Sequence, residues 1–149
     1  MIRSTCITIL FSTILLVGCA QNNNTGETSV DSDVTRQVVN HHWETFVAND
    51  LDGVMADYTE ESILITPDTT YKGLDAIRAN FVRAFEAYPA DSSTLILNKT
   101  VVEQEIGYIT WEATTPDFNL RFGTDTFVIE DGKIVRQTYG GITDQQLSQ

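Results

Sequence analysis

Lysine and arginine are scarce in this chain of 149 residues, where nine of them stand against 21 Asp and Glu. The formal net charge is −12 at pH 7. A surface this acidic repels the phosphates of nucleic acids and the headgroups of anionic lipids, so we expect neither as a partner. Solubility is the simplest reason for such a charge, and the acidity alone therefore names no function.

Cysteine is also scarce. The two cysteines, Cys6 and Cys19, are both near the N-terminus, so residues 20–149 offer no thiol for a disulfide, a metal ion or a nucleophile. The sequence contains no phosphate-binding glycine loop, no serine nucleophile elbow and no cluster at metal-ligand spacing. His41 and His42 are adjacent, which on a helix places them about 100° apart, too far to chelate one metal. We expect no metal and no cofactor.

The one long apolar run lies at the N-terminus. Arg3 precedes Ile7–Val17, which is too short to span a membrane and is typical of a targeting segment. The motif Leu16-Val17-Gly18-Cys19 then resembles the lipobox of bacterial lipoproteins. That resemblance implies cleavage before Cys19 and acylation of its sulfur and new amino group. Several acyl chains make a stable anchor, because each buried methylene contributes about 0.8 kcal/mol. An ordinary secretory signal cleaved nearby is the alternative.

The predicted cleavage before Cys19 divides the chain into a signal peptide, a tether, a domain and a tail. Removal of residues 1–18, which hold one arginine and no acid, takes the net charge to −13. Residues 19–32 are then the lipidated cysteine and a polar, flexible tether, residues 33–144 a single domain, and residues 145–149 a tail. By resemblance to the sorting pattern of lipoproteins, the lack of aspartate after the cysteine implies the outer membrane in a host that has one. We expect a lipid-anchored protein of the bacterial cell envelope, on the periplasmic side.

Helices come first in the domain and strands follow. Apolar residues spaced by threes and fours predict three helices. The first is capped by Asp33 or Ser32 and runs to about Asn49, the second is Leu51–Tyr58 capped by Asp50, and the third follows Gly73 and ends at Pro89. Strands are predicted over Glu61–Thr66, Leu95–Val102, Ile106–Thr114 and the two arms of Phe118–Ile142. The fold class is α+β, with a strongly curved antiparallel sheet wrapped around about three N-terminal helices.

The last two strands form a hairpin around Asp131-Gly132, a dipeptide preferred in two-residue type I′ turns because both positions need positive φ. That turn predicts three opposed pairs: Ile129 with Ile134, Phe127 with Arg136, and Asp125 with Thr138. Arg121 is expected on the same face of the hairpin. An acid and two arginines among large apolar groups are typical of a pocket floor, where Asp125 would pair with one of the arginines.

Several short motifs carry a resemblance to a known fold. They are Asn49-Asp50-Leu51-Asp52, Tyr58-Thr59-Glu60-Glu61-Ser62, Tyr71-Lys72-Gly73 followed by Ile77, and Phe127–Ile134 at the hairpin. In this order and spacing the chain resembles the nuclear-transport-factor-2-like superfamily, in its SnoaL-like and ketosteroid-isomerase-like branch of small cone-shaped domains. The resemblance spans almost the whole predicted domain.

The resemblance implies an apolar pocket, open at one end, between the curved sheet and the helices. Six aromatic residues are candidates for its wall: Trp43, Tyr58, Phe81, Phe85, Trp111 and Phe127. Plain core packing is the alternative for each of them. The family also implies a homodimer, formed through apolar groups on the outer face of the sheet.

Four residues are candidates for chemistry. Members of the family that catalyse commonly hold an Asp as base in the pocket, where burial can shift its pKa toward the working pH. Asp125 and Asp68 are the candidate bases, and Arg121 and His42 the candidate charge stabilisers. The alternatives are a structural ion pair for Asp125, a turn former for Asp68, and a core histidine for His42.

Two functions of different classes remain. The first is a lipid-anchored domain that binds a small apolar molecule or assembles through its sheet. The second is an acid/base enzyme of the isomerase, cyclase or hydrolase type. No residue matches the Tyr and Asp pair that forms the oxyanion hole of ketosteroid isomerases, nor the water-positioning partners of the epoxide hydrolases. The sequence therefore favours the binding domain.

Overall fold

The computed structural model describes residues 31–145. The predicted signal peptide, Cys19 and nearly all of the predicted tether lie outside these residues, as does the tail beyond residue 145. Within residues 31–145, no helix is both long enough and apolar enough to cross a membrane.

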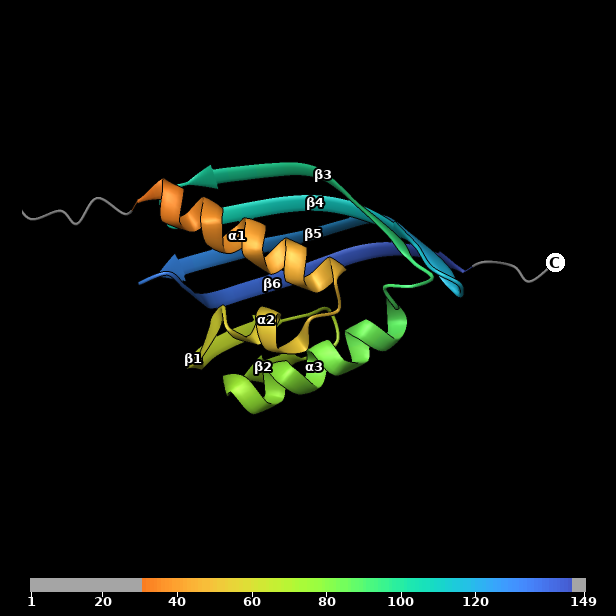
Figure 1. The fold of residues 1–149 in the computed structure, drawn as a ribbon, viewed down its shortest axis with the longest axis horizontal. Helices are drawn as coiled ribbons and strands as arrows, with labels where there is room; N and C mark the ends of the chain where they lie inside the picture. The colour runs from red at the N-terminus through yellow and green to blue at the C-terminus, as the bar shows by residue number, and fades with distance from the viewer. Residues whose placement is uncertain (1–30, 146–149) are drawn as a thin grey trace, which may run out of the picture.

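Three helices and six strands make up the described part of the chain (Figure 1). In order they are α1 (Ser32–Val47), α2 (Leu51–Met55), β1 (Tyr58–Ile65), β2 (Thr70–Lys72), α3 (Gly73–Ala87), β3 (Thr94–Glu103), β4 (Ile106–Thr114), β5 (Phe118–Glu130) and β6 (Lys133–Gln145). The predicted elements are all present. Tyr58, however, begins β1 instead of ending the second helix.

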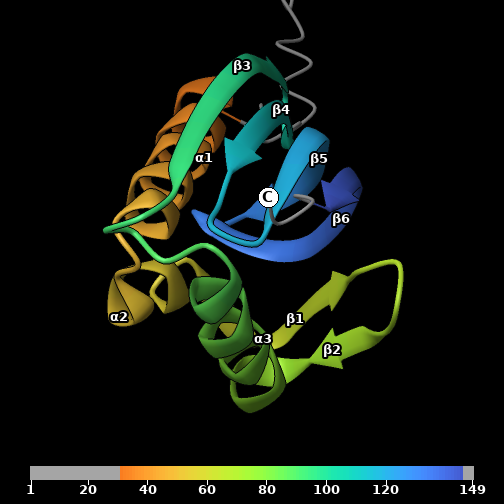
Figure 2. The same ribbon diagram turned by 90° about the vertical axis from the view of Figure 1, so that its right-hand side faces the viewer.

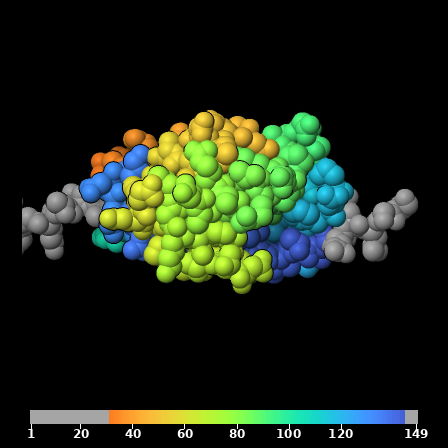
Figure 3. Space-filling view, turned by 90° about the horizontal axis from the view of Figure 1, so that it is seen from below, coloured from red at the N-terminus to blue at the C-terminus, as the bar shows by residue number. Residues whose placement is uncertain are grey.

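The strands form one curved sheet in the order β2-β1-β6-β5-β4-β3. Figure 2 shows it bending so that β1 and β2 turn away from β3, with α1 beside β3 and β4 and α3 beside β1 and β2. Seen from below, the yellow-green and green atoms of the segment from β1 to α3 occupy the middle of the molecule, with blue atoms of the later strands at both ends (Figure 3). The α+β class and the curved sheet are confirmed. The sheet is mixed, because β1 runs parallel to β6 while the other neighbours are antiparallel.

Aspartates begin the first two helices. The Asp31 side chain accepts a hydrogen bond from the backbone N–H of Asp33 and caps α1, so the predicted caps Ser32 and Asp33 are wrong and both residues lie inside the helix. The Asp50 side chain accepts from the backbone N–H of Gly53 at 2.9 Å and caps α2, as predicted. Capping of this kind satisfies N–H groups that have no partner in the helix.

The hairpin turn is confirmed, because Asp131 and Gly132 both have positive φ, 49° and 72°. Ile129 lies opposite Ile134 as predicted. The next residue, Val135, has no partner on β5 and forms a bulge. Beyond it Phe127 lies opposite Gln137 and Asp125 opposite Tyr139, so the predicted pairs with Arg136 and Thr138 are wrong.

A second register shift lies on β5 between Leu120 and Phe122. Arg121 has no opposite residue there, and the shift changes which side chains share a face. Leu120 is buried, as is Asp125 five residues on, whereas Arg121 is exposed. The predicted alignment of Arg121 with Asp125 is therefore wrong.

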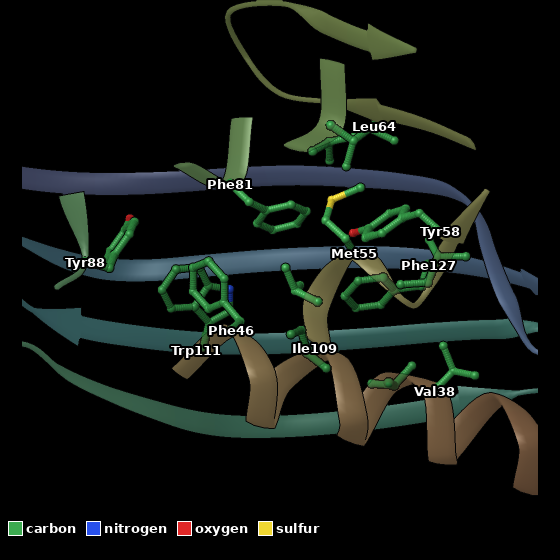
Figure 4. Packing of buried hydrophobic residues seen from close by; sticks show 14 of the residues in the cluster. Val38, Phe46, Met55, Tyr58, Leu64, Phe81, Tyr88, Ile109, Trp111 and Phe127 are labelled. Atoms are coloured by element: carbon green, nitrogen blue, oxygen red, sulfur yellow. The ribbon is translucent and has the colours of Figure 1, made fainter. Parts of the chain in front are cut away.

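The core lies between the helices and the concave face of the sheet. Figure 4 shows Tyr58, Met55 and Phe127 at one end of it, and Phe46, Trp111 and Tyr88 at the other. Phe127, Ile77 and Ile134 have no exposed surface, and they hold β5, α3 and β6 together. Burial of each such side chain contributes about 1.5–3 kcal/mol.

Candidate functional site

A cavity of about 480 Å³ lies between α1, α3, the β1–β2 connection and strands β4–β6. Its wall is mainly aromatic and consists of Trp43, Phe46, Phe81, Tyr88, Trp111 and Tyr139. The exposed and half-buried residues at its mouth include Thr66, Asp68, Tyr71, Asn80 and Arg83. The cavity therefore occupies the end of the core that Phe46, Trp111 and Tyr88 surround, whereas the other end is filled by side chains (Figure 4).

Asp125 lines this cavity from β5 and is only 6% exposed. The indole N–H of Trp111 donates to its Oδ2 at 2.9 Å, and the amide Nε2 of Gln137 donates to its Oδ1 at 2.8 Å. The Tyr58 hydroxyl in turn donates to Oε1 of Gln137. These contacts form one chain of hydrogen bonds, which fixes the orientation of the carboxyl group.

Burial dominates the electrostatics of the site. Loss of hydration raises the pKa of Asp125, and the hydrogen bonds from Gln137 and Trp111 and the nearby His42 offset only part of that rise. Burial also raises the pKa values of Tyr58 and Tyr139. These phenols therefore stay protonated at neutral pH and act as neutral hydrogen-bonding groups.

No lysine or arginine of residues 31–145 forms an ion pair with Asp125. The guanidinium Nε of Arg121 lies 2.6 Å from a carboxylate oxygen of Asp144, at the surface. Arg136 donates to the backbone carbonyls of Glu61 and Val135. The predicted pairing of Asp125 with an arginine is wrong, because both arginines are exposed.

His42 lines the cavity from α1 and is 4% exposed. Its ring lies edge-on to the rings of Tyr58, Phe81 and Phe127, at centroid distances of 5.1–5.7 Å. Its Nδ1 is 3.5 Å from Oδ2 of Asp57, and neither atom has a hydrogen-bond partner within the described residues. Each atom is thus the nearest available partner of the other, and a small closure would join them.

The other oxygen of Asp57 is held by the neighbouring histidine. Nδ1 of His41 lies 2.8 Å from Oδ1 of Asp57, although the His41 side chain is 49% exposed. Asp57 lies just before β1 and is buried. One carboxylate therefore faces both histidines, and no spacing in the sequence indicates this role for Asp57.

The structure brings three of the four chemical candidates to the cavity. Asp125 and His42 lie inside it and Asp68 at its mouth, whereas Arg121 lines a separate surface hollow with Asp144. Of the six predicted wall residues, Trp43, Phe81 and Trp111 line the cavity, and Tyr58, Phe85 and Phe127 do not. These last three belong to the packed core or its edge.

Most of the lining residues were not predicted as site residues, and Gln137, Tyr88 and Tyr139 are the polar ones among them closest to the chemistry of Asp125. Alternation from the hairpin turn assigns Gln137 and Tyr139 to the outer face, and the bulge at Val135 moves them inward. The hydroxyls of Tyr88 and Tyr139 lie 3.5 Å apart. Among the residues that the structure describes, no group of three His, Cys, Asp or Glu side chains could hold a metal ion.

Comparison with known proteins places the chain in a family. The family model of the SnoaL-like domain matches residues 39–137. No curated protein matches the chain at a significant level. A proposed ketosteroid isomerase from Kribbella flavida DSM 17836 is similar in structure, with a TM-score of 0.63, 19% identity, and coverage of 80% of this chain and 86% of that chain.

Other solved structures share the fold. A proposed polyketide cyclase from Sinorhizobium meliloti has a TM-score of 0.62 and 19% identity, covering 73% of this chain and 98% of its own. A de novo designed protein with a curved β-sheet has a TM-score of 0.65 and 12% identity, covering 75% of this chain and 88% of its own. At such identities these structures indicate the fold and not the activity. With the family model spanning most of the described chain, this protein belongs to the SnoaL-like domain family.

Proposed function

We propose that this domain binds a small, largely apolar molecule in the cavity and that Asp125 orients it there. The observation that carries the proposal is a buried carboxyl group, fixed by Trp111 and Gln137, in an otherwise aromatic wall. Ligand sites typically combine apolar walls with a few fixed polar groups, in cavities of about 300–1,000 Å³. The cavity here, about 480 Å³, falls in that range.

Native mass spectrometry of the protein purified gently from its own host tests this proposal. We expect a retained molecule in the wild type. Ala84 lines the cavity on α3, so Ala84→Met fills part of it and should abolish retention. Ala79 is an exposed residue of the same helix, so Ala79→Met is the matched control and should retain the molecule. An empty wild type, or equal retention by both variants, would refute ligand binding in this cavity.

Acid/base catalysis is the second candidate function. Burial raises the pKa of Asp125, which suits a general acid or base, and His42 with Asp57 lies close by. Two structural relatives are described as a proposed ketosteroid isomerase and a proposed polyketide cyclase, and such reactions require proton transfer at carbon. In D2O the wild type should place deuterium on the retained molecule, and Asp125→Asn should not. Equal exchange by both would exclude Asp125 as the base.

We propose that Cys19 carries a lipid that holds the domain at the bacterial cell envelope, with residues 20–32 as a tether. The support is the resemblance of Leu16-Val17-Gly18-Cys19 to a lipobox. Wild-type protein should sediment with membranes, and Cys19→Ala should be released from them. Release of neither protein from membranes, or of both, would contradict anchoring through this residue.

We also propose that the protein assembles into a homodimer through the outer face of its sheet. Phe122 and Ile142 lie directly opposite each other on β5 and β6 and are 42% and 54% exposed. Ile96 on β3 is 48% exposed and also apolar. Exposed apolar groups on a sheet face favour association with a second surface of the same kind.

A further inference from the structure

The charges around the cavity are distributed unevenly. Inside it, Asp125 is the one carboxyl group, and none of the lysines and arginines of residues 31–145 pairs with it. The one arginine that lines the cavity is Arg83, an exposed residue at the mouth. We propose that the cavity takes an organic cation, a protonated amine or a quaternary ammonium group, whose charge lies against Asp125. This inference rests on the proposed binding function and names its ligand class.

The carboxyl group has capacity for a further partner. Each of its oxygens accepts one hydrogen bond, from Trp111 or from Gln137. An ionised carboxylate has about four acceptor positions, so about two remain. Since Asp125 lines the cavity, a donor on a bound molecule can reach it from that side.

The surrounding rings also favour positive charge. Trp111 lies within 5.5–6.1 Å, centroid to centroid, of the rings of Trp43, Tyr88 and Tyr139. All four rings line the cavity. The face of an aromatic ring attracts a cation, most strongly for Trp and where water is excluded. An anionic or neutral ligand gains no such attraction, so the wall and the carboxylate select the same charge.

Arg83 does not reverse this preference. Its Nη2 donates to the Tyr71 hydroxyl at 3.1 Å, and the guanidinium lies over the Tyr71 ring at 5.5 Å. It is therefore held at the mouth, where the exposed acid Asp68 also lies. The net charge of −12 further raises the local concentration of cations around the molecule.

The titration of Asp125 offers a further measure of the same contact. Burial raises its pKa through the loss of hydration, and a bound cation would lower that pKa again. The polar and titratable groups near the carboxyl are Trp111, Gln137, His42, Tyr58, Tyr88 and Tyr139. The three tyrosines stay protonated in the acid range, and His42 lies beside Asp125 in the cavity and is tested by a variant of its own.

Three probes of similar size test the inference: phenethylamine, which is a cation at neutral pH, phenethyl alcohol, which is neutral, and hydrocinnamate, which is an anion. Binding is followed by tryptophan fluorescence of the full-length protein carrying Cys19→Ala. Both tryptophans of the chain line the cavity and report on it. We expect the wild-type site to bind the amine about tenfold or more tightly than the alcohol.

Three variants show which carboxylate causes the preference for the amine over the alcohol. Asp125→Asn should abolish the preference for the amine over the alcohol. Asp68→Asn and Glu86→Gln remove one negative charge at the mouth and on the exposed face of α3, and both should keep the preference. Loss of the preference in Glu86→Gln would assign it to the overall charge and overturn the inference.

The outcomes separate the two proposals. Equal or tighter binding of the alcohol, or tightest binding of hydrocinnamate, overturns the cation and leaves the binding site in place. Binding of none of the probes removes both proposals.

If Asp125→Asn does not fold, a pH series on otherwise unchanged protein replaces it. The amine should lose its advantage in acid, while the affinity for the alcohol stays constant. The same loss should persist in His42→Gln, because Asp125 causes it. If the amine still binds more tightly than the alcohol in acid, the inference is overturned. It is also overturned if the amine keeps its advantage in acid in His42→Gln.

Discussion

Asp125→Asn should leave the fold intact and make it more stable at neutral pH. The carbonyl oxygen of the substituted side chain can accept from Trp111 as Oδ2 of Asp125 does now. The new NH2 group then faces the Gln137 amide, which can rotate by half a turn and present its oxygen. The Gln137 nitrogen would then donate to the Tyr58 hydroxyl oxygen, so both hydrogen bonds of Gln137 in the present chain reverse their direction. The Tyr58 hydroxyl then accepts a hydrogen bond and no longer donates one to Gln137, which offsets part of the gain from losing the buried negative charge.

The size of the stability change follows from the difference between the pKa of Asp125 in the folded protein and in the unfolded chain. The pKa of Asp125 is raised in the folded protein, whereas in the unfolded chain it is about 3.9. Between these two values the folded state binds more protons, so the free energy of unfolding falls as pH rises from the lower to the higher value. Above both values the wild type has lost about 1.4 kcal/mol for each unit of pKa elevation. Asp125→Asn lacks this loss.

The assay is urea unfolding of wild type and variant across the acid to neutral range. Taking the difference between the two proteins at each pH cancels the titration of the other carboxylates. We expect the two stabilities to agree in acid, where Asp125 is protonated, and to diverge toward neutral pH in favour of the variant. Asp125→Leu is the matched control: it orphans the Trp111 indole N–H and should cost about 1–3 kcal/mol for each unsatisfied group at every pH.

One result would refute this reasoning. If Asp125→Asn is destabilised by several kcal/mol, equally at acid and neutral pH, the native carboxyl must be ionised and stabilised throughout that range. Burial would then not determine its pKa, and the proposals for Asp125 as a base or as a partner for a cation would need a different physical basis.

Two further predictions concern the cavity wall and the outer face. A Cβ at Gly123 would lie 2.7 Å from Cδ2 of Leu120 and 2.8 Å from the Trp111 ring, so Gly123→Ala must displace both side chains. It should lower the unfolding free energy by about 1–3 kcal/mol and weaken ligand retention. At Gly140 the nearest heavy atom would be at an ordinary 3.8 Å, so a thermal melt of Gly140→Ala should match the wild type, and equal losses in both would contradict this account. Replacing Phe122 and Ile142 together by serine should give monomers in sedimentation equilibrium with an unchanged melting temperature; a dimer that persists would place the contact elsewhere.

Local chemistry in the sequence predicts much of this fold correctly. Asp50 caps α2 because its short side chain reaches a free N–H within the first turn, which depends only on neighbouring residues. Asp131-Gly132 forms the hairpin turn because both residues tolerate positive φ. The parallel pairing of β1 with β6 is not predictable in this way, because it joins strands that lie far apart in the chain, with β2, α3, β3, β4 and β5 between them.

The site itself was only half predictable, and the two bulges are the reason. Alternation along a strand assigns faces only while each residue has a partner, and one extra residue reverses every assignment beyond it. The bulge at Val135 brings Gln137 to Asp125, and the shift at Arg121 lets that arginine turn to the surface. The arginine that the sequence predicts as partner is thus replaced by a neutral amide.

That exchange changes the chemistry of the cavity. An arginine beside Asp125 would compensate its charge, hold its pKa low and leave no attraction for a ligand cation. The neutral donors Gln137 and Trp111 orient the same carboxyl but leave its charge uncompensated, which raises its pKa. A carboxyl in that state is suited to take up a proton or to meet a positive ligand. Both proposals for Asp125 therefore depend on a single unpaired residue, Val135, in the strand opposite.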